Sequence, residues 1–264
     1  MATFYSLAKP MTKTKLATAG LFLWMLAALT AADESSKIYA ARAEQEFHRT
    51  QALFQSATNN TTNAWQFARA SFDFAELATN DTQRADLARL GIAACRQLLT
   101  HEPKSAPGHY YLAMNYGELA DAEAPSLAAY RLVKDVEREF KTAAELDEHF
   151  DYAGPVRNLG ELYFQAPGWP LSVGNKRKAR EWLERAVMLA PEYPENLLNL
   201  AEMQLKWHQT EDAAVSLQKL DVLWPAALTN FSGTAWESSW NDWRRRRLII
   251  QTEAARLAPG KSMR

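Results

Sequence analysis

The stretch AREWLERAVMLAP at Ala179–Pro191 has a counterpart, AAVSLQKLDVLWP, at Ala213–Pro225. The two stretches are 34 residues apart, and this offset aligns Leu183 with Leu217. Apolar residues recur in both at the three- and four-residue spacing of an amphipathic helix. Each stretch ends at a proline, which is common just beyond a helix end. A repeat of this length predicts pairs of helices that bury their apolar faces by stacking on one another.

A second pattern describes the first helix of each pair. In this pattern an apolar residue is followed directly by a small residue. One larger side chain stands three positions before the apolar residue, and another stands three positions after the small residue. Small residues at this point allow paired helices to approach closely, so we expect close contacts at Ala113, Gly160 and Ala201. Beyond the repeat length, the sequence contains inserts at Leu119–Leu132 and Gln165–Asn175. The pattern occurs at Phe67–Phe74, His109–Tyr116, Val156–Tyr163 and Leu197–Gln204.

In this register the chain resembles the tetratricopeptide repeat (TPR) superfamily over residues 63–225. The resemblance implies an all-α, TPR-like right-handed solenoid of antiparallel helix pairs with capping helices at both ends. More narrowly, Gly154–Tyr163, the insert Ala166–Asn175 and Lys178–Val187 are similar to the T component (TatT) of TRAP-type transporters. That family consists of exported helical repeat proteins that pair with a solute-binding protein and hold small apolar ligands, so the resemblance implies those roles here.

The N-terminal residues have the composition of a secretory signal peptide. Three lysines precede the apolar run 16–29, and small residues follow at 30–32. We expect cleavage after Ala32 and export to the periplasm, with an uncleaved N-terminal membrane anchor as the alternative. The expected organisation is a signal peptide at 1–32, a capping helix at 33–62, a TPR-like repeat domain at 63–233, and a C-terminal capping helix with tail at 234–264.

Charge and motifs narrow the classes of function. The chain has 30 Lys and Arg against 31 Asp and Glu, so no basic field favours nucleic acid as a partner. The phosphate-binding, dinucleotide-binding, nucleophile-elbow and zinc-site patterns are absent from the sequence. We therefore expect no catalytic residue, no metal and no cofactor. The single cysteine, Cys95, is expected to be a small buried apolar side chain.

Residues on the first helices, opposite the packing positions, are expected to face the concave groove of the solenoid. An apolar groove with one arginine and two glutamates would suit a peptide, or a small amphipathic molecule whose acid end meets Arg157. In the alternative, Arg157 and Glu161 neutralise each other and the aromatic residues form core. Trp169, in the insert, either anchors a partner or folds back onto its helices. The predicted binding residues are Phe72, Tyr110, Met114, Arg157, Glu161, Phe164, Trp169, Leu198 and Glu202.

Trp236, Trp240 and Trp243 share one face of the last predicted helix. This face either caps the final repeat or contacts a partner or a membrane surface. Taken together, the sequence predicts an exported, non-catalytic scaffold that binds a protein partner in the periplasm. The alternative is a T-component-like accessory protein of a solute transporter, which binds a small hydrophobic or carboxylate ligand and a solute-binding protein. The sequence leaves the oligomeric state open.

Overall fold

The computed structural model describes residues 19–168 and 170–257, and this part of the chain is built almost entirely of helices. Residues 1–18 of the expected signal peptide and Trp169 lie outside the described residues. In the part that is described, no helix combines the length and apolar character needed to cross a membrane. The helices are α1 (Ala19–Ser56), α2 (Thr61–Ala75), α3 (Asp81–His101), α4 (Ala106–Ala122), α5 (Leu127–Leu146), α6 (Phe150–Gln165), α7 (Lys176–Leu189), α8 (Pro194–Lys206), α9 (Thr210–Asn230) and α10 (Glu237–Leu257), with a 3-10 turn at Thr234–Trp236.

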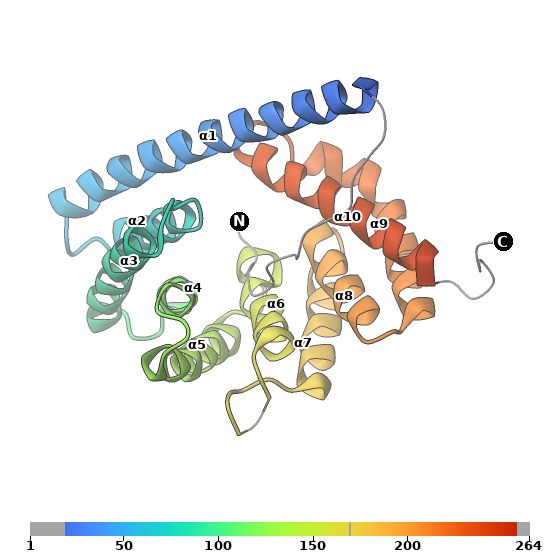
Figure 1. Cartoon of the computed structure of the whole chain (residues 1–264). Helices are drawn as coiled ribbons and strands as arrows, with labels where there is room; N and C mark the ends of the chain where they lie inside the picture. The colour runs from blue at the N-terminus through green and yellow to red at the C-terminus, as the bar shows by residue number, and fades with distance from the viewer. Residues whose placement is uncertain (1–18, 169, 258–264) are drawn as a thin grey trace.

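The helix pairs form an arc (Figure 1). α2, α4, α6 and α8 lie along its inner side, and α3, α5, α7 and α9 pack behind them on the outer side. α1 runs across the open side of the arc, from α2 to α10. Its Phe47 and Phe54 rings lie 5.4 and 5.5 Å from the ring of Phe67 in α2. At the other side of the opening, Arg42 of α1 donates a hydrogen bond of 2.5 Å to Glu237 of α10.

Polar residues that precede the helices determine where several of them begin. Each such residue has its side-chain oxygen bonded to the backbone N–H three positions later. Asn and Ser are the residues that best satisfy the free N–H groups at a helix start. These N-caps are Asn60, Asn80, Ser105, Ser126 and Asn175.

Of the two helix ends predicted at prolines, one is confirmed and the other is wrong. α7 ends two residues before Pro191. α9, in contrast, continues through Pro225. Proline in a helix removes one backbone hydrogen bond, but tertiary packing holds this segment helical. The ring of Trp224, next to the proline, packs edge-on against Trp240 of α10, with centroids 5.1 Å apart.

The small residues predicted at close helix contacts lie at such contacts. A Cβ added to Gly160 of α6 would stand 2.6 Å from Cγ of Leu183 in α7. Ala113 of α4 and Ala201 of α8 are completely buried. The register predicted from the 34-residue offset is therefore confirmed.

The two predicted inserts have different structures. The insert at Leu119–Leu132 mainly lengthens α4 and α5 and leaves a short turn between them. The insert at Gln165–Asn175 forms a loop between α6 and α7. Within this loop the N–H of Gly174 donates to the carbonyl of Pro167 at 2.9 Å. Only the second insert therefore forms a projecting loop between paired helices.

The three tryptophans cap the final helix pair, as one of the two interpretations predicts, although Trp236 lies in the 3-10 turn before α10 and not in the last helix itself. Trp240 and Trp243 are buried, and Trp236 is half-buried. The ring of Trp243 packs edge-on against Tyr193, at the start of α8, with centroids 5.3 Å apart. Trp240 also donates its indole N–H to the carbonyl of Phe231. Aromatic packing of this kind covers the apolar end of the solenoid.

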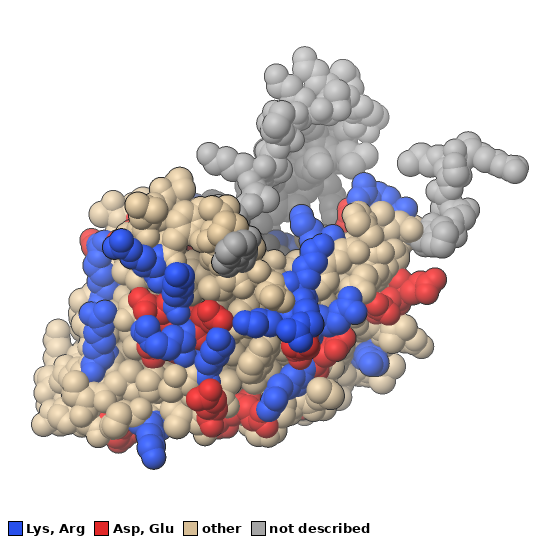
Figure 2. Space-filling view, turned by 90° about the horizontal axis from the view of Figure 1, so that it is seen from below, with Lys and Arg blue, Asp and Glu red and all other residues tan. Residues whose placement is uncertain are grey.

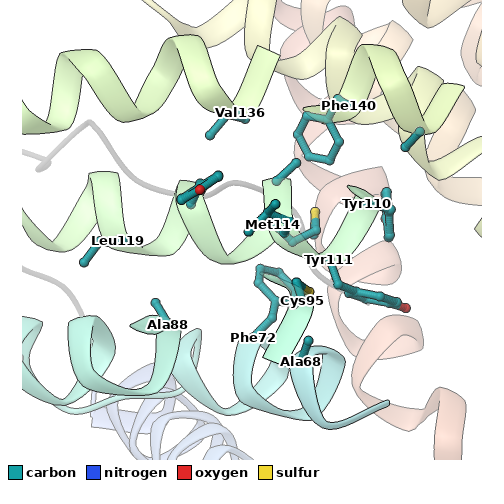
Figure 3. Packing of buried hydrophobic residues seen from close by; sticks show 14 of the residues in the cluster. Ala68, Phe72, Ala88, Cys95, Tyr110, Tyr111, Met114, Leu119, Val136 and Phe140 are labelled. Carbon is teal, nitrogen blue, oxygen red and sulfur yellow. The ribbon is translucent and has the colours of Figure 1, made fainter. Parts of the chain in front are cut away.

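Cys95 is a buried apolar residue, as predicted. It lies in the packing region of Ala68, Phe72 and Met114, between the helices of the first two pairs (Figure 3). Burial raises the pKa of its thiol, and the charge of Glu139 acts in the same direction. Because the thiolate is the reactive form, this cysteine is chemically inert in the folded chain.

The contact at Gly160 leads to a test of the fold. Gly160→Ala should lower the free energy of unfolding by about 1–3 kcal/mol, although alanine improves helix propensity, because the added methyl group overlaps Leu183. Urea denaturation followed by circular dichroism measures the change. Gly168→Ala is the control, since its nearest neighbour would be 3.7 Å away. Equal stability of the two variants would contradict the packing described here.

Candidate functional site

A left-handed turn precedes the regular part of α6. Asp151, Tyr152 and Ala153 have φ angles of 51, 56 and 62°. This conformation costs a residue other than glycine roughly 1–2 kcal/mol. Arg157, one turn later, compensates by donating from Nη1 to the carbonyl of Tyr152 at 3.1 Å. Its Nη2 lies 3.7 Å from Oδ2 of Asp151, so one side chain holds the strained turn together.

Arg157 is completely enclosed at the junction of α6 and α8. Nη1 donates to Oδ1 of Asn196 at 3.3 Å, and the guanidinium carbon lies 5.1 Å from the centroid of the Tyr193 ring. The ionic partner of Arg157 is Asp151, and not Glu161 as the alternative interpretation of the sequence predicts. Its Nε atom is buried and has no hydrogen-bond partner among the described residues.

A second buried guanidinium, that of Arg246, joins α10 to α8. Nε and Nη2 donate to the two carboxylate oxygens of Glu202 at 2.8 and 2.7 Å, which is a bidentate arrangement. Nη2 also donates to Oδ1 of Asn199, and Nη1 lies 3.9 Å from Glu195. Buried charges are tolerated when they are paired and hydrogen-bonded. The side chain of Arg246 thus neutralises the acidic stripe that α8 presents.

Glu161 of α6 lies close to this group. Burial and the negative charge of Glu202 together raise the pKa of its carboxyl to about 8, although the charge of Arg246 opposes this shift. One carboxyl oxygen accepts a hydrogen bond of 2.7 Å from Gln165. The other, Oε1, is buried with no partner in the described part of the chain. At pH 7 Glu161 is therefore a largely neutral carboxyl group, able to donate as well as accept.

A small depression with aromatic and charged lining occupies the inner side nearer the first two helix pairs. It is lined by Phe72, Tyr110 and Met114 together with Tyr111 and the charged side chains of Arg69, Asp73 and Asp151. Asn158 of α6 donates to the hydroxyl of Tyr110 at 3.0 Å, which connects this depression to the neighbourhood of Arg157. The inner side therefore has an aromatic part over α2 and α4 and an ionic part over α6, α8 and α10.

The structure brings the predicted binding residues together in two groups. Phe72, Tyr110 and Met114 are buried core side chains next to the small depression, as the alternative interpretation of the sequence predicts. Arg157, Glu161 and Glu202 belong to the ionic part. Leu198 is completely buried in the core between the last helix pairs. Phe164 lies apart, where its ring packs on Trp207 with centroids 5.7 Å apart. Trp169 lies outside the described residues.

Sequence reasoning missed four residues of the ionic part. Two of them, Glu195 and Asn199, form a series with Glu202 at spacings of four and three positions. Residues at this spacing lie on one face of a helix. That spacing could have identified them. Asp151 gave no such signal because its role depends on the left-handed turn. Arg246 is one of four consecutive arginines, and only the docking of α10 selects it.

The Arg246 contacts generate a stability prediction. Arg246→Met should lower the free energy of unfolding by about 3 kcal/mol or more, because it leaves the acidic groups of α8 without their cation. Arg256→Met, which removes an exposed pair with Glu253, should change it by less than about 0.5 kcal/mol. Thermal or urea unfolding gives both values. Similar small losses in both variants would show that the buried network contributes little.

Glu161 predicts how stability depends on pH. Its pKa of about 8 in the folded chain lies above its ordinary value of 4.5. Between these values the folded chain holds a proton that the unfolded chain releases, so stability falls as pH rises through this window. Glu161→Gln removes that titration and should be more stable than the wild type by about 1–3 kcal/mol at pH 9, with little gain at pH 5. Urea denaturation at both pH values tests this, and parallel pH profiles would contradict it.

Comparison with solved structures supports the fold. A thermophilic TPR protein of Thermus thermophilus is 16% identical, with a TM-score of 0.57 over 82% of this chain and 94% of that one. YrrB, a TPR protein with an unusual peptide-binding site, is 14% identical with a TM-score of 0.41 over 80% and 93% of the two chains. The yeast Tom70 is 10% identical with a TM-score of 0.33 over 85% and 60%. No family model and no curated protein matches the chain, so the narrower similarity to the T component gains no support. The chain has the all-α, TPR-like right-handed solenoid fold that its sequence predicts.

Proposed function

We propose that this protein is an exported, non-catalytic scaffold that holds an extended segment of a protein partner on the inner side of its arc. The TPR-like fold supports a binding role, because solenoids present long concave surfaces to their partners. The apolar run 16–29, preceded by lysines and followed by small residues, supports export to the periplasm.

The observation that carries the proposal is a set of buried polar atoms on the inner helices. Within the described residues, Nε of Arg157, Oε1 of Glu161 and Nδ2 of Asn199 have no hydrogen-bond partner. A buried polar atom without a partner costs about 1–3 kcal/mol. Arg157 and Asn199 supply donors, and the neutral carboxyl of Glu161 either donates or accepts. The carbonyl and N–H groups of an extended peptide backbone would satisfy both kinds once the side chains that cover these atoms move aside.

The alternative, a transport accessory protein that carries a small apolar ligand, needs a cavity for that ligand. The depression next to Phe72, Tyr110 and Met114 has a volume of about 10 Å³, which is about the minimum for one water molecule. A protein segment is therefore favoured over a small molecule at this place. A periplasmic solute-binding protein, implied by the T-component resemblance, is the first candidate for the partner.

The test is purification of the mature chain from the periplasmic fraction of its own cells, followed by native mass spectrometry and affinity measurements with the recovered partner. We expect a protein complex in which this chain begins at Asp33. Asn199→Asp keeps the oxygen that accepts from Arg246 but removes the free Nδ2 donor. It should weaken binding by about tenfold, the effect of one unpaired polar group.

Met188→Glu is the matched control, because Met188 is 74% exposed on α7, an outer helix. It should leave the affinity unchanged. Weaker binding by Met188→Glu but not by Asn199→Asp would place the partner on the outer side and overturn the proposal. A stoichiometric small molecule in the purified chain, without a protein partner, would favour the carrier alternative.

A further inference from the structure

A shallow depression lies on the rim of the arc, where α7 begins directly after the loop 166–175. It is lined by Lys176, Arg177, Arg180, Trp207 and Gln209 and has a volume of about 400 Å³. We call this site the rim depression. This volume lies at the low end of the range for ligand-binding pockets. None of its lining residues belongs to the inner ionic part, so it is a separate surface.

The rim depression carries an excess of positive charge. Of its lining residues, Lys176 and Arg177 occupy the first turn of α7, which has no acidic residue. The helix dipole disfavours cations at this end by about 0.3–1 kcal/mol each, so helix stability does not explain them. Arg177 lies 3.4 Å from Glu181, but its side chain remains 79% exposed. Arg180 is also exposed.

The surrounding surface is different in character. Figure 2, seen from the side of α5 and α7, shows Lys and Arg interleaved with Asp and Glu across this face. Such interleaving leaves little net field, because neighbouring charges compensate each other. Several of these basic residues are indeed paired, as Lys141 is with Glu137 and Arg185 with Glu148. The rim depression is thus a local basic site in a mixed surface.

Trp207 provides an apolar floor. Its indole ring is half-buried and packs edge-on against Phe164, with centroids 5.7 Å apart. The ammonium group of Lys176 lies 5.6 Å from the ring centroid. A fixed aromatic ring next to cations can bury an apolar or aromatic side chain while the cations bind flanking carboxylates.

The walls of the rim depression are preformed. The N–H of Asn175 donates to the carbonyl of Tyr163 at 2.9 Å, and the Asn175 side chain caps α7. Across the depression, the N–H of Gln209 donates to the carbonyl of Gln204 at 2.8 Å. A surface that is already ordered loses little conformational entropy when it binds.

We propose that the rim depression docks an acidic segment of a partner protein, one in which Asp or Glu residues flank an aromatic side chain. The carboxylates pair with Lys176, Arg177 and Arg180, and the aromatic ring rests on Trp207. Charge complementarity selects this occupant. The proposal goes beyond the inner side, because it assigns a second surface that binds through different residues.

The test uses fluorescence anisotropy with a labelled peptide in which Asp and Glu flank a Trp residue. The full mature chain should bind it, and affinity should fall as salt is raised. The triple variant Lys176→Glu, Arg177→Glu and Arg180→Glu should bind at least about tenfold more weakly. The matched control, Lys104→Glu, Arg131→Glu and Lys134→Glu, makes the same change of net charge at exposed sites elsewhere and should bind as the wild type does.

Each remaining outcome overturns the proposal. Equal losses in both triple variants would show that the peptide responds only to net charge. No binding by the wild type would show that the rim depression does not bind such a segment. Tighter binding of single-stranded DNA of the same charge would show that it binds a different class of partner. Asn199→Asp should bind the peptide normally, so failure here is distinguishable from failure of the inner-side proposal.

Discussion

Close contact between paired helices is the constraint on which the arc depends. At Gly160 there is no room for a methyl group, because Leu183 of the outer helix occupies that space. Between neighbouring pairs the contact is equally close, because the space beside Gly91 of α3 is filled by the amide of Asn115 in α4. In a protein interior packed at this density, a shift of one helix displaces the helices that pack against it. These contacts therefore determine the positions of the inner helices. They also determine where the side chains on the concave side lie.

The ionic part of the inner side is possible only because distant elements supply partners for its charges. α8 presents three polar side chains on one stripe, and Arg246 of α10 binds two of them directly. Arg157 likewise binds the left-handed turn at the start of α6, through the carbonyl of Tyr152 and the carboxylate of Asp151. The C-terminal helix thus has two roles, since its tryptophans close the apolar end of the solenoid and its arginine completes the inner surface.

The chemical character of the side chains is distributed unevenly over the molecule. The first helix pairs contribute aromatic surface, the later pairs contribute hydrogen-bonding and charged groups, and the beginning of α7 contributes exposed cations. α1 crosses the open side and contacts α10 through the exposed pair of Arg42 and Glu237. An exposed pair of this kind contributes about 1 kcal/mol or less.

The sequence by itself determined the helix pairs, their 34-residue register and the small contact residues such as Gly160, because these are written in local periodicity. The four-residue spacing also placed Tyr110 and Met114 on one face of a helix, but only the structure shows that they and Phe72 are core side chains. Only the tertiary structure decided that the helix continues through Pro225, that Arg157 pairs with Asp151, and which of four arginines is buried. The pairing of Arg157 with Asp151 depends on the left-handed turn between them, which no local pattern encodes. The other two features depend on contacts between residues far apart in the chain, such as Arg246 and Asn199, which are 47 positions apart.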